Sequence, residues 1–207
     1  MRLQDAKRDQ YRRLAREQGY KSRAAYKLLE SVRKHRLIKK GDVVLDFGAA
    51  PGGWLQVASE AAGESGLVVG VDLEPVDLNE DNIVAIQSDV KSPELALRLE
   101  KALPRRADVL LSDLSPQVTG TWDLDHFRQI DLTFAAVSLM GGFLRKGGNA
   151  MFKVFDGERF GEIRGSLSKQ FKTVQVTKPK ASRSESAELY LVCLDYLQGA
   201  TSSPRDS

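Results

Sequence analysis

Short apolar runs alternate with longer amphipathic stretches through the middle of this chain. Four of the runs end in an acidic residue or lead into one, and they cover residues 43–47, 67–72, 83–86 and 109–113. Continuous apolar runs of this length are typical of buried parallel strands. The stretches 53–62, 93–103 and 124–144 have helical spacing, and Lys-Gly-Gly at 146–148 is a helix stop. We therefore predict strands and helices in alternation.

The C-terminal part adds three more predicted strands, at 150–155, 173–176 and 188–194, with a helix at 162–170 after the first of them. Only the short segment 178–183 connects the last two strands. A parallel return needs a longer crossover, so these two strands are expected to pair antiparallel at that edge. The whole pattern predicts an α/β fold with helices on both faces of a doubly wound sheet, and with ligands at the carboxyl ends of the strands.

The N-terminal region combines a helical pattern with strong positive charge. Ser22 precedes the stretch 23–32 and is a candidate N-cap, while an apolar face is formed by Ala25, Leu28, Leu29 and Val32, with Lys27 beside it. Residues 1–40 contain 14 Lys or Arg and 4 Asp or Glu, a balance of +10, although the whole chain carries only +3. Clustered positive charge favours a polyanionic partner. A surface helix with merely solvated charges is the alternative.

Composition narrows the class of protein further. The chain of 207 residues is long enough for one substantial core, and we expect a monomer. Its single cysteine, Cys193, excludes an internal disulfide framework and a cysteine-rich zinc site, so no metal is expected. No apolar run has the length needed to cross a bilayer, and the N-terminus lacks the apolar segment of a secretory signal. We expect a cytoplasmic protein without membrane contact.

The loop after the first predicted strand, residues 46–54, contains glycines at 48, 52 and 53. Glycines allow a tight turn and close approach of a ligand, and a helix that starts near Gly53 offers free N–H groups to a carboxylate. Asp72 ends the second strand and is placed to bind ribose hydroxyls, and Asp89 is placed to meet an adenine amine. A nicotinamide dinucleotide would need a similar acid, but the glycine spacing differs from Gly-x-Gly-x-x-Gly.

Two charged residues are predicted at the same edge of the sheet. Asp113 closes the fourth strand, and Lys153 lies within the fifth between apolar neighbours. Adjacent parallel strands end on one rim, so both side chains can face one cleft. A lysine in such an apolar strand is unusual, which favours a functional role over a purely structural ion pair.

Six motifs extend this pattern over nearly the whole chain. They lie at 22–28, 46–54, 112–116, 152–155, 182–183 and 188–192. In these motifs the sequence resembles the FtsJ/RrmJ family of ribose 2′-O-methyltransferases, bacterial and archaeal members of which act on large-subunit ribosomal RNA. The resemblance implies a Rossmann-like methyltransferase fold with a mostly parallel seven-stranded sheet and an antiparallel edge strand.

The resemblance also implies roles for individual residues. S-adenosylmethionine is the expected methyl donor, and its expected contacts are Gly52, Trp54, Asp72, Asp89 and Asp113. The expected catalytic tetrad is Lys27, Asp113, Lys153 and Glu188, with Lys153 as the base. A lysine is ordinarily charged at neutral pH, so a basic role needs burial or a neighbouring cation. Lys27 would favour that role while the two carboxylates oppose it, and a charged Lys153 would instead stabilise a developing alkoxide.

The expected substrate is a ribose in ribosomal RNA or the large ribosomal subunit, and a uridine is the expected nucleotide. Residues 1–40 are then an RNA-contacting extension, 41–198 the catalytic domain and 199–207 a disordered tail. Phosphate contacts are expected from Arg12, Arg13, Arg16, Lys21 and Arg23, with Tyr11 and Tyr20 as candidate stacking groups or packing residues.

Other functions remain as alternatives at this point. The same chemistry could act on transfer RNA, and the chain could be a non-catalytic RNA-binding protein. A small-molecule methyltransferase would carry an extra segment over its substrate. Methylation of pyrimidine carbon-5 needs a cysteine nucleophile, and Cys193 lies within the last predicted strand. Amino-methyltransferases commonly have Asp or Asn before Pro-Pro-aromatic, from which residues 113–116 depart.

Overall fold

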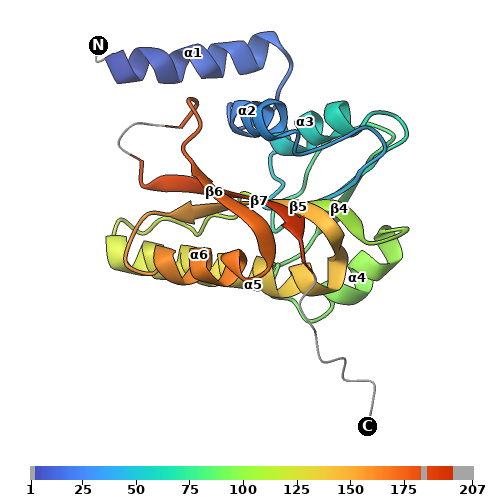
Figure 1. Ribbon diagram of the computed structural model, residues 1–207. Coiled ribbons are helices and arrows are strands. Elements are labelled where there is room, and N and C mark those ends of the chain that lie inside the picture. Colours follow the sequence, from blue (N-terminus) through green and yellow to red (C-terminus); the bar gives the residue numbers. More distant parts are fainter. Residues whose placement is uncertain (1–2, 183–185, 198–207) are drawn as a thin grey trace.

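The computed structural model describes residues 3–182 and 186–197, so the tail predicted at 199–207 lies outside the described part. Seven strands form one sheet in the order β3-β2-β1-β4-β5-β7-β6 (Figure 1). The strands are β1 Val43–Phe47, β2 Leu67–Asp72, β3 Ile83–Gln87, β4 Ala107–Ser112, β5 Leu144–Phe155, β6 Phe171–Thr177 and β7 Glu188–Tyr196. The helices are α1 Leu3–Glu17, α2 Ala25–His35, α3 Gly53–Ala62, α4 Leu95–Ala102, α5 Trp122–Phe143 and α6 Phe160–Ser168.

The predicted α/β class and parallel sheet are confirmed, but the position of the antiparallel strand is not. Strands β3, β2, β1, β4 and β5 pair in parallel, and β7 pairs antiparallel with both β5 and β6. The antiparallel strand therefore lies one place in from the edge, which β6 occupies. The crossover through α6 leaves the width of one strand between β5 and β6, and the short return places β7 in that gap.

Two strands differ in detail from the sequence prediction. Strand β3 forms the other edge of the sheet, and its Val84 and Ala85 are exposed rather than buried. Strand β5 begins at Leu144 and includes the glycines that were predicted to separate helix from strand. Its register against β4 shifts opposite Asp108, where Gly147 has a φ of +73°. These glycines therefore form an irregularity within the strand.

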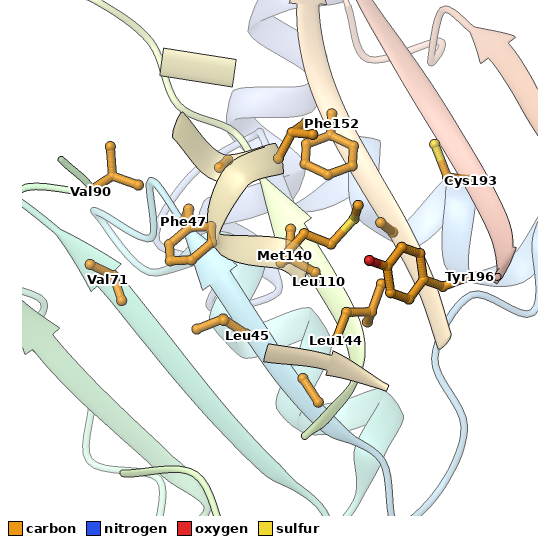
Figure 2. Close-up of a cluster of buried hydrophobic side chains, with 14 of the residues drawn as sticks. Leu45, Phe47, Val71, Val90, Leu110, Met140, Leu144, Phe152, Cys193 and Tyr196 are labelled. Atoms are coloured by element: carbon orange, nitrogen blue, oxygen red, sulfur yellow. The ribbon is translucent and has the colours of Figure 1, made fainter. Parts of the chain in front are cut away.

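Helices cover both faces of the sheet, as predicted. Figure 1 shows α4, α5 and α6 on one face and α2 and α3 on the other. The first face carries a core that includes Leu45, Phe47, Leu110, Met140 and Phe152, drawn in Figure 2. The apolar faces of α2 and α3 form the second core with the opposite side of β1, β4, β5 and β7. Packing on both faces fixes the sheet and therefore the positions of the carboxyl ends of its strands.

Helix α2 belongs to this second core, although it lies within the basic region. Ala25 and Leu28 are fully buried, and Lys27 is buried as well, with 7% of its surface exposed. The predicted N-cap at Ser22 is wrong, because Ala24 occupies the N-cap position and makes no side-chain cap. Ser22 instead packs against α3, where a Cβ on Gly53 would lie only 2.5 Å from its Oγ.

Helix α1 extends beyond α2, away from the sheet (Figure 1). Tyr11 connects it to the body of the protein through a tilted ring contact with Tyr26, with 5.4 Å between the ring centroids. The Tyr26 hydroxyl donates to Gln18 at 2.8 Å, just after the helix ends.

Among the described residues, no helix combines the length and the apolar character needed to cross a membrane.

Candidate active site

The glycine-rich loop begins at the end of β1 and leads into α3. Gly48 has a φ of +83°, and a Cβ there would lie 2.8 Å from the backbone nitrogen of Leu114. Gly52 has a φ of +114° and precedes the first residue of α3. Both positions need glycine because the backbone is left-handed, and at Gly48 the neighbouring chain also leaves no room for a side chain. The close approach at Gly48 brings the loop directly against Asp113.

A cavity of about 370 Å³ opens at the carboxyl ends of β2, β3, β4 and β5. Its size is suitable for a small organic ligand. Four of the residues singled out from the sequence line it together, namely Asp72, Asp89, Asp113 and Lys153. Gly48 and Ala50 contribute the wall on the side of the loop, whereas Gly52 and Trp54 do not line this cavity.

Asp72 is held between the loop and the end of its own strand. One carboxylate oxygen accepts a hydrogen bond from the backbone N–H of Ala50, and the other accepts one from Glu74, each at 2.9 Å. A carboxylate oxygen has a second lone pair, so each can accept another hydrogen bond from a ligand. Asp89 is fixed in a similar way by the N–H of Lys91, at 2.9 Å.

Trp54 connects α3 to α2 from inside the protein. Its indole N–H donates to the carbonyl oxygen of Ala24 at 2.9 Å, and only 3% of the residue is exposed. The indole also packs against the ring of Tyr190, with 5.9 Å between centroids. The side chain is therefore occupied by packing, which leaves the backbone of Trp54 as the part able to contact a ligand.

Lys153 and Asp113 form an ion pair in the wall of the cavity. Their Nζ and Oδ1 atoms are 3.2 Å apart, and the same Nζ donates to the backbone carbonyl of Asp113 at 2.9 Å. The pairing of Ser112 with Phe152 in adjacent strands brings the two residues together. Only 6% of Lys153 is exposed, so this ammonium group depends on protein oxygens for its contacts.

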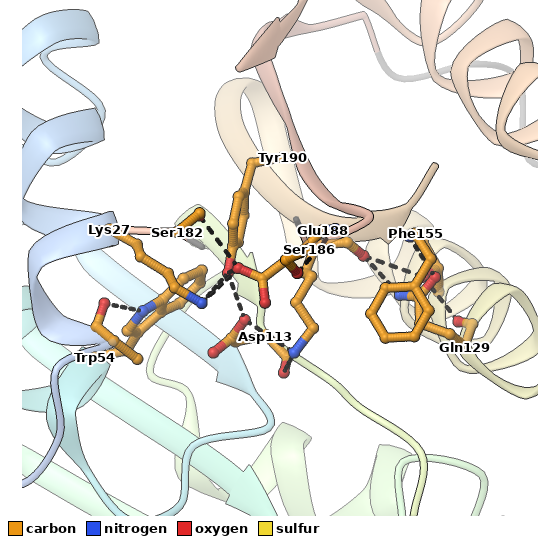
Figure 3. Close-up of polar contacts among 12 residues, drawn as sticks. Lys27, Trp54, Asp113, Gln129, Phe155, Ser182, Ser186, Glu188 and Tyr190 are labelled. Carbon is orange, nitrogen blue, oxygen red and sulfur yellow. Dashed lines mark hydrogen bonds and ion pairs between the residues drawn. The ribbon is translucent and has the colours of Figure 1, made fainter. Parts of the chain in front are cut away.

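A second ion pair joins this one. Lys27 on α2 donates to Glu188 at the start of β7, and its Nζ lies 3.2 Å from the hydroxyl of Tyr190. Figure 3 shows these groups converging between α2 and the ends of β4, β5 and β7. The structure thus brings together all four residues expected for the tetrad.

Tyr190 is the residue of this cluster that sequence reasoning missed. Its hydroxyl oxygen lies 2.9 Å from Asp113 and 2.8 Å from Glu188, so the hydroxyl can donate to either carboxylate (Figure 3). Glu188 and Tyr190 are two residues apart in a strand and share a face, which is the signal that could have identified the tyrosine. Its register partner is Lys153.

The two lysines determine the ionisation of the carboxylate between them. Burial alone raises the pKa of Glu188, but the positive charges of Lys27 and Lys153 and the hydrogen bonds from Lys27 and Tyr190 outweigh burial and lower it. Burial and the neighbouring Asp113 and Glu188 raise the pKa of Tyr190 well above its usual value. Glu188 is therefore an anion, and Tyr190 keeps its proton.

Asp46 is an unusual acid beneath the loop. It is fully buried in β1, and neither carboxylate oxygen has a hydrogen-bond partner among the described residues. Burial, together with the negative charges of Asp113 and Asp72, raises the pKa of Asp46 well above its usual value. The buried carboxyl group therefore favours its neutral form.

The residues expected to bind RNA lie on α1 and on the segment between α1 and α2. Arg12, Arg13, Arg16 and Lys21 are exposed, and Arg23 is half-buried. Tyr20 is used for packing, because its hydroxyl donates to Glu60 at 2.8 Å and its ring meets that of Tyr26 edge-on.

Cys193 is fully buried, and burial raises the pKa of its thiol, which argues against carbon-5 methylation through this residue.

Sequence comparisons identify relatives along nearly the whole chain. The model of the FtsJ-like methyltransferase family matches residues 20–196. A protein of Cenarchaeum symbiosum named ribosomal RNA large subunit methyltransferase E is 52% identical over 95% of this chain and 99% of its own. A protein of the same name from Nitrosopumilus maritimus is 44% identical over 95% of this chain and all of its own.

Solved structures of other proteins have the same fold. A Plasmodium falciparum protein described as a ribosomal RNA methyltransferase is 30% identical, with a TM-score of 0.77 over 86% of this chain and 99% of its own. Fibrillarin from Aeropyrum pernix, solved with bound S-adenosyl-L-methionine, shares the fold at 18% identity, with a TM-score of 0.59 over 84% of this chain and 75% of its own. The chain therefore belongs to the FtsJ-like family of S-adenosylmethionine-dependent methyltransferases.

Proposed function

We propose that this protein methylates the 2′-hydroxyl of a ribose in large-subunit ribosomal RNA, with a uridine as the acceptor. The observation that carries the proposal is the Lys153–Asp113 pair in the wall of the donor cavity. A lysine beside the methyl donor suits an oxygen acceptor, whose proton must be drawn away before it attacks. The class of RNA is supported by the names of the relatives, which are large-subunit ribosomal RNA methyltransferases.

The residues of the cavity fit S-adenosylmethionine. Gly48 and Ala50 line the cavity on the side of the loop, and the N-terminus of α3 suits the carboxylate of the methionine part. Asp72 is oriented to accept hydrogen bonds from ribose hydroxyls, and Asp89 is the proposed partner of the adenine amine. Four acidic residues line the cavity, Asp72, Glu74, Asp89 and Asp113, and their negative charge also suits a ligand that carries a positive sulfonium. When bound, the donor supplies a methyl group on a good leaving group.

Lys153 is the proposed base on the acceptor side. To act as a base, the ammonium group of Lys153 first releases a proton to solvent; the resulting amine then accepts the proton of the 2′-hydroxyl while the ribose oxygen forms its bond to the methyl carbon and the bond from that carbon to sulfur breaks. Asp113 holds the Nζ of Lys153 through two oxygens, which limits its positions. Lys27 engages Glu188, so the second carboxylate is occupied elsewhere. Tyr190 retains its proton and is not a candidate base.

The substrate is tested by incubating the protein with labelled donor and, in parallel, with large ribosomal subunits, free ribosomal RNA and transfer RNA. The expected result is one methyl group on the 2′-oxygen of a uridine in the large-subunit RNA. A methyl group on a base, or methylation of transfer RNA alone, would contradict the proposal. Failure to bind donor by calorimetry would favour the alternative of a non-catalytic RNA-binding protein.

A further inference from the structure

Exposed apolar side chains gather at the start of α5, outside the donor cavity. Among the described residues nine large apolar side chains are exposed, and four of them lie between positions 118 and 127. These four are Val118, Trp122, Leu124 and Phe127. A local concentration of exposed apolar surface on a folded protein marks a binding site more often than chance placement does.

Trp122 lies close to the end of the strand that carries Lys153. Its indole is stacked near Phe155, with 6.1 Å between centroids and 15° between planes, and near His126 at 5.8 Å and 20°. Half of its surface, 50%, is nevertheless exposed. Phe155 follows Lys153 by two residues in β5, about 7 Å along the strand. The exposed indole therefore stacks near a residue two positions along the strand from the proposed base.

This aromatic surface is held rigidly. The carboxylate of Asp125, which is 4% exposed, accepts hydrogen bonds from the backbone N–H and the hydroxyl of Thr119, each at 2.8 Å, and from the N–H of Gly120 at 3.1 Å. These contacts fix the loop before α5 onto the first turn of the helix. A preformed aromatic surface loses little conformational entropy when it binds a ligand.

A cation lies at the border of the same surface. The guanidinium of Arg159 is 5.6 Å from the centroid of the Phe127 ring, and it also pairs with Glu162 at 2.9 Å. Unpaired RNA bases are commonly bound by aromatic rings and by arginine guanidinium groups. The surface includes Phe155 of β5, the strand that carries the proposed base Lys153, and this position favours RNA over a protein as the partner.

We infer that Trp122 and Phe155 form the stacking surface for the base of the nucleotide that is methylated, an inference that rests on the proposed function. The base is attached to the ribose carbon next to the one that carries the 2′-hydroxyl. A nucleotide with its 2′-oxygen at Lys153 therefore has its base beside the active site. When that base leaves its stack in the RNA, an aromatic face replaces its former stacking partners.

The tryptophan itself reports on this contact. The chain contains two tryptophans, and Trp54 is buried at 3% exposure while Trp122 is half-exposed. Titration with a short single-stranded uridine-containing RNA should quench the fluorescence of the native protein, and Trp122→Phe should remove most of that quenching. Anisotropy of a labelled copy of the same RNA, measured in parallel, shows whether the RNA is bound.

Kinetics on free ribosomal RNA provide the second measurement. Trp122→Ala should raise KM for RNA by about 5- to 150-fold, the range of stacking contributions per base, with kcat and donor affinity little changed. Trp122→Phe should restore most of the affinity. Leu97→Ala on α4 removes a similarly exposed apolar side chain away from the site and should have no effect.

The outcomes separate the inference from the proposed function. If RNA binds and is methylated with normal KM by Trp122→Ala, and the native fluorescence is not quenched, the inference is wrong while the function stands. A defect confined to assembled subunits and absent on free RNA would also overturn it, because the surface would then bind a ribosomal protein. If the native protein methylates no RNA, the proposed function itself fails.

Discussion

The side-chain amide of Gln129 donates a hydrogen bond to the backbone carbonyl of Lys153, at 2.8 Å, and its oxygen accepts one from the N–H of Phe155, at 3.0 Å (Figure 3). Strand β4 ends at Ser112, opposite Phe152, so β5 continues past the end of its neighbour. Backbone groups on that edge would be left without partners, and the fully buried amide of Gln129 replaces the missing strand. Hydrogen bonds from α5 therefore hold the strand backbone at the proposed base in place.

Gln129→Leu should reduce both stability and methyl transfer. The variant leaves the partly buried N–H of Phe155 without this partner, which costs about 1–3 kcal/mol, while the carbonyl of Lys153 keeps only the hydroxyl of Thr133, at 3.3 Å. Displacement of Lys153 should lower kcat more than it changes donor affinity. Urea denaturation and single-turnover kinetics measure the two effects. Gln170→Leu, two residues past the end of α6, is the control, and equal kcat for Gln129→Leu and the native protein would contradict the positioning role.

Breaking the Lys27–Glu188 pair should affect stability and activity differently. Lys27→Met leaves Glu188 without its partner in a largely buried setting, which should destabilise the fold by about 3–5 kcal/mol. The double variant Lys27→Met/Glu188→Gln removes both charges and should recover much of that stability in chemical denaturation. It should not recover methyl transfer, because the charges around Tyr190 and Lys153 remain altered. Full recovery of methyl transfer by the double variant would show that the pair has only a structural role.

Asp46→Asn should stabilise the protein increasingly as the pH rises. The pKa of Asp46 is raised in the folded state, so the folded protein holds a proton that the unfolded chain releases, and stability is lost as pH rises from the usual carboxyl range through the raised pKa. The asparagine variant lacks this loss. The difference in free energy of unfolding between variant and native protein should be smallest near pH 3 and larger at pH 8. A difference that is constant with pH would contradict a neutral Asp46.

Charge reversal on α1 tests the proposed RNA contacts. Arg12→Glu/Arg16→Glu should weaken RNA binding and reduce the slope of log affinity against log salt by about one for each phosphate group that is no longer bound. Donor affinity should stay unchanged, because no residue of α1 lines the cavity. The control is Lys101→Glu/Lys169→Glu, which changes the same charge elsewhere on the exposed surface. An unaltered salt slope for the α1 variant would show that these arginines do not contact phosphate groups of the RNA.

Patterns local in sequence predicted much of the site. The apolar strands place Asp72, Asp89 and Asp113 at strand ends, and parallel strands necessarily bring those ends to one rim. Lys153 was recognisable as a lysine in an apolar strand. The resemblance added Lys27 and Glu188, which lie on elements whose position in space the local pattern does not define.

Interactions that depend on register and packing were not predictable in the same way. Tyr190 enters the cluster because β7 lies beside β5, whereas the sequence indicated only that β7 runs antiparallel to β6. Gln129 looks like any polar residue of a helix until the end of β4 leaves part of β5 unpaired. Ser22 has the residue type of a helix cap, but α2 begins at Ala25 with Ala24 as its N-cap, and Ser22 packs against Gly53.

Lys153 is proposed to act on the ribose hydroxyl, and the proposed reaction depends on this role. Its most direct test is the single-turnover rate of methyl transfer by Lys153→Ala with saturating RNA and donor. We predict a rate lower by about 10²- to 10⁴-fold, the usual contribution of a general base, with donor affinity retained. Lys146→Ala, an exposed lysine of the same strand, should transfer methyl groups at the native rate. A native rate for Lys153→Ala with donor bound would contradict a catalytic role for this lysine.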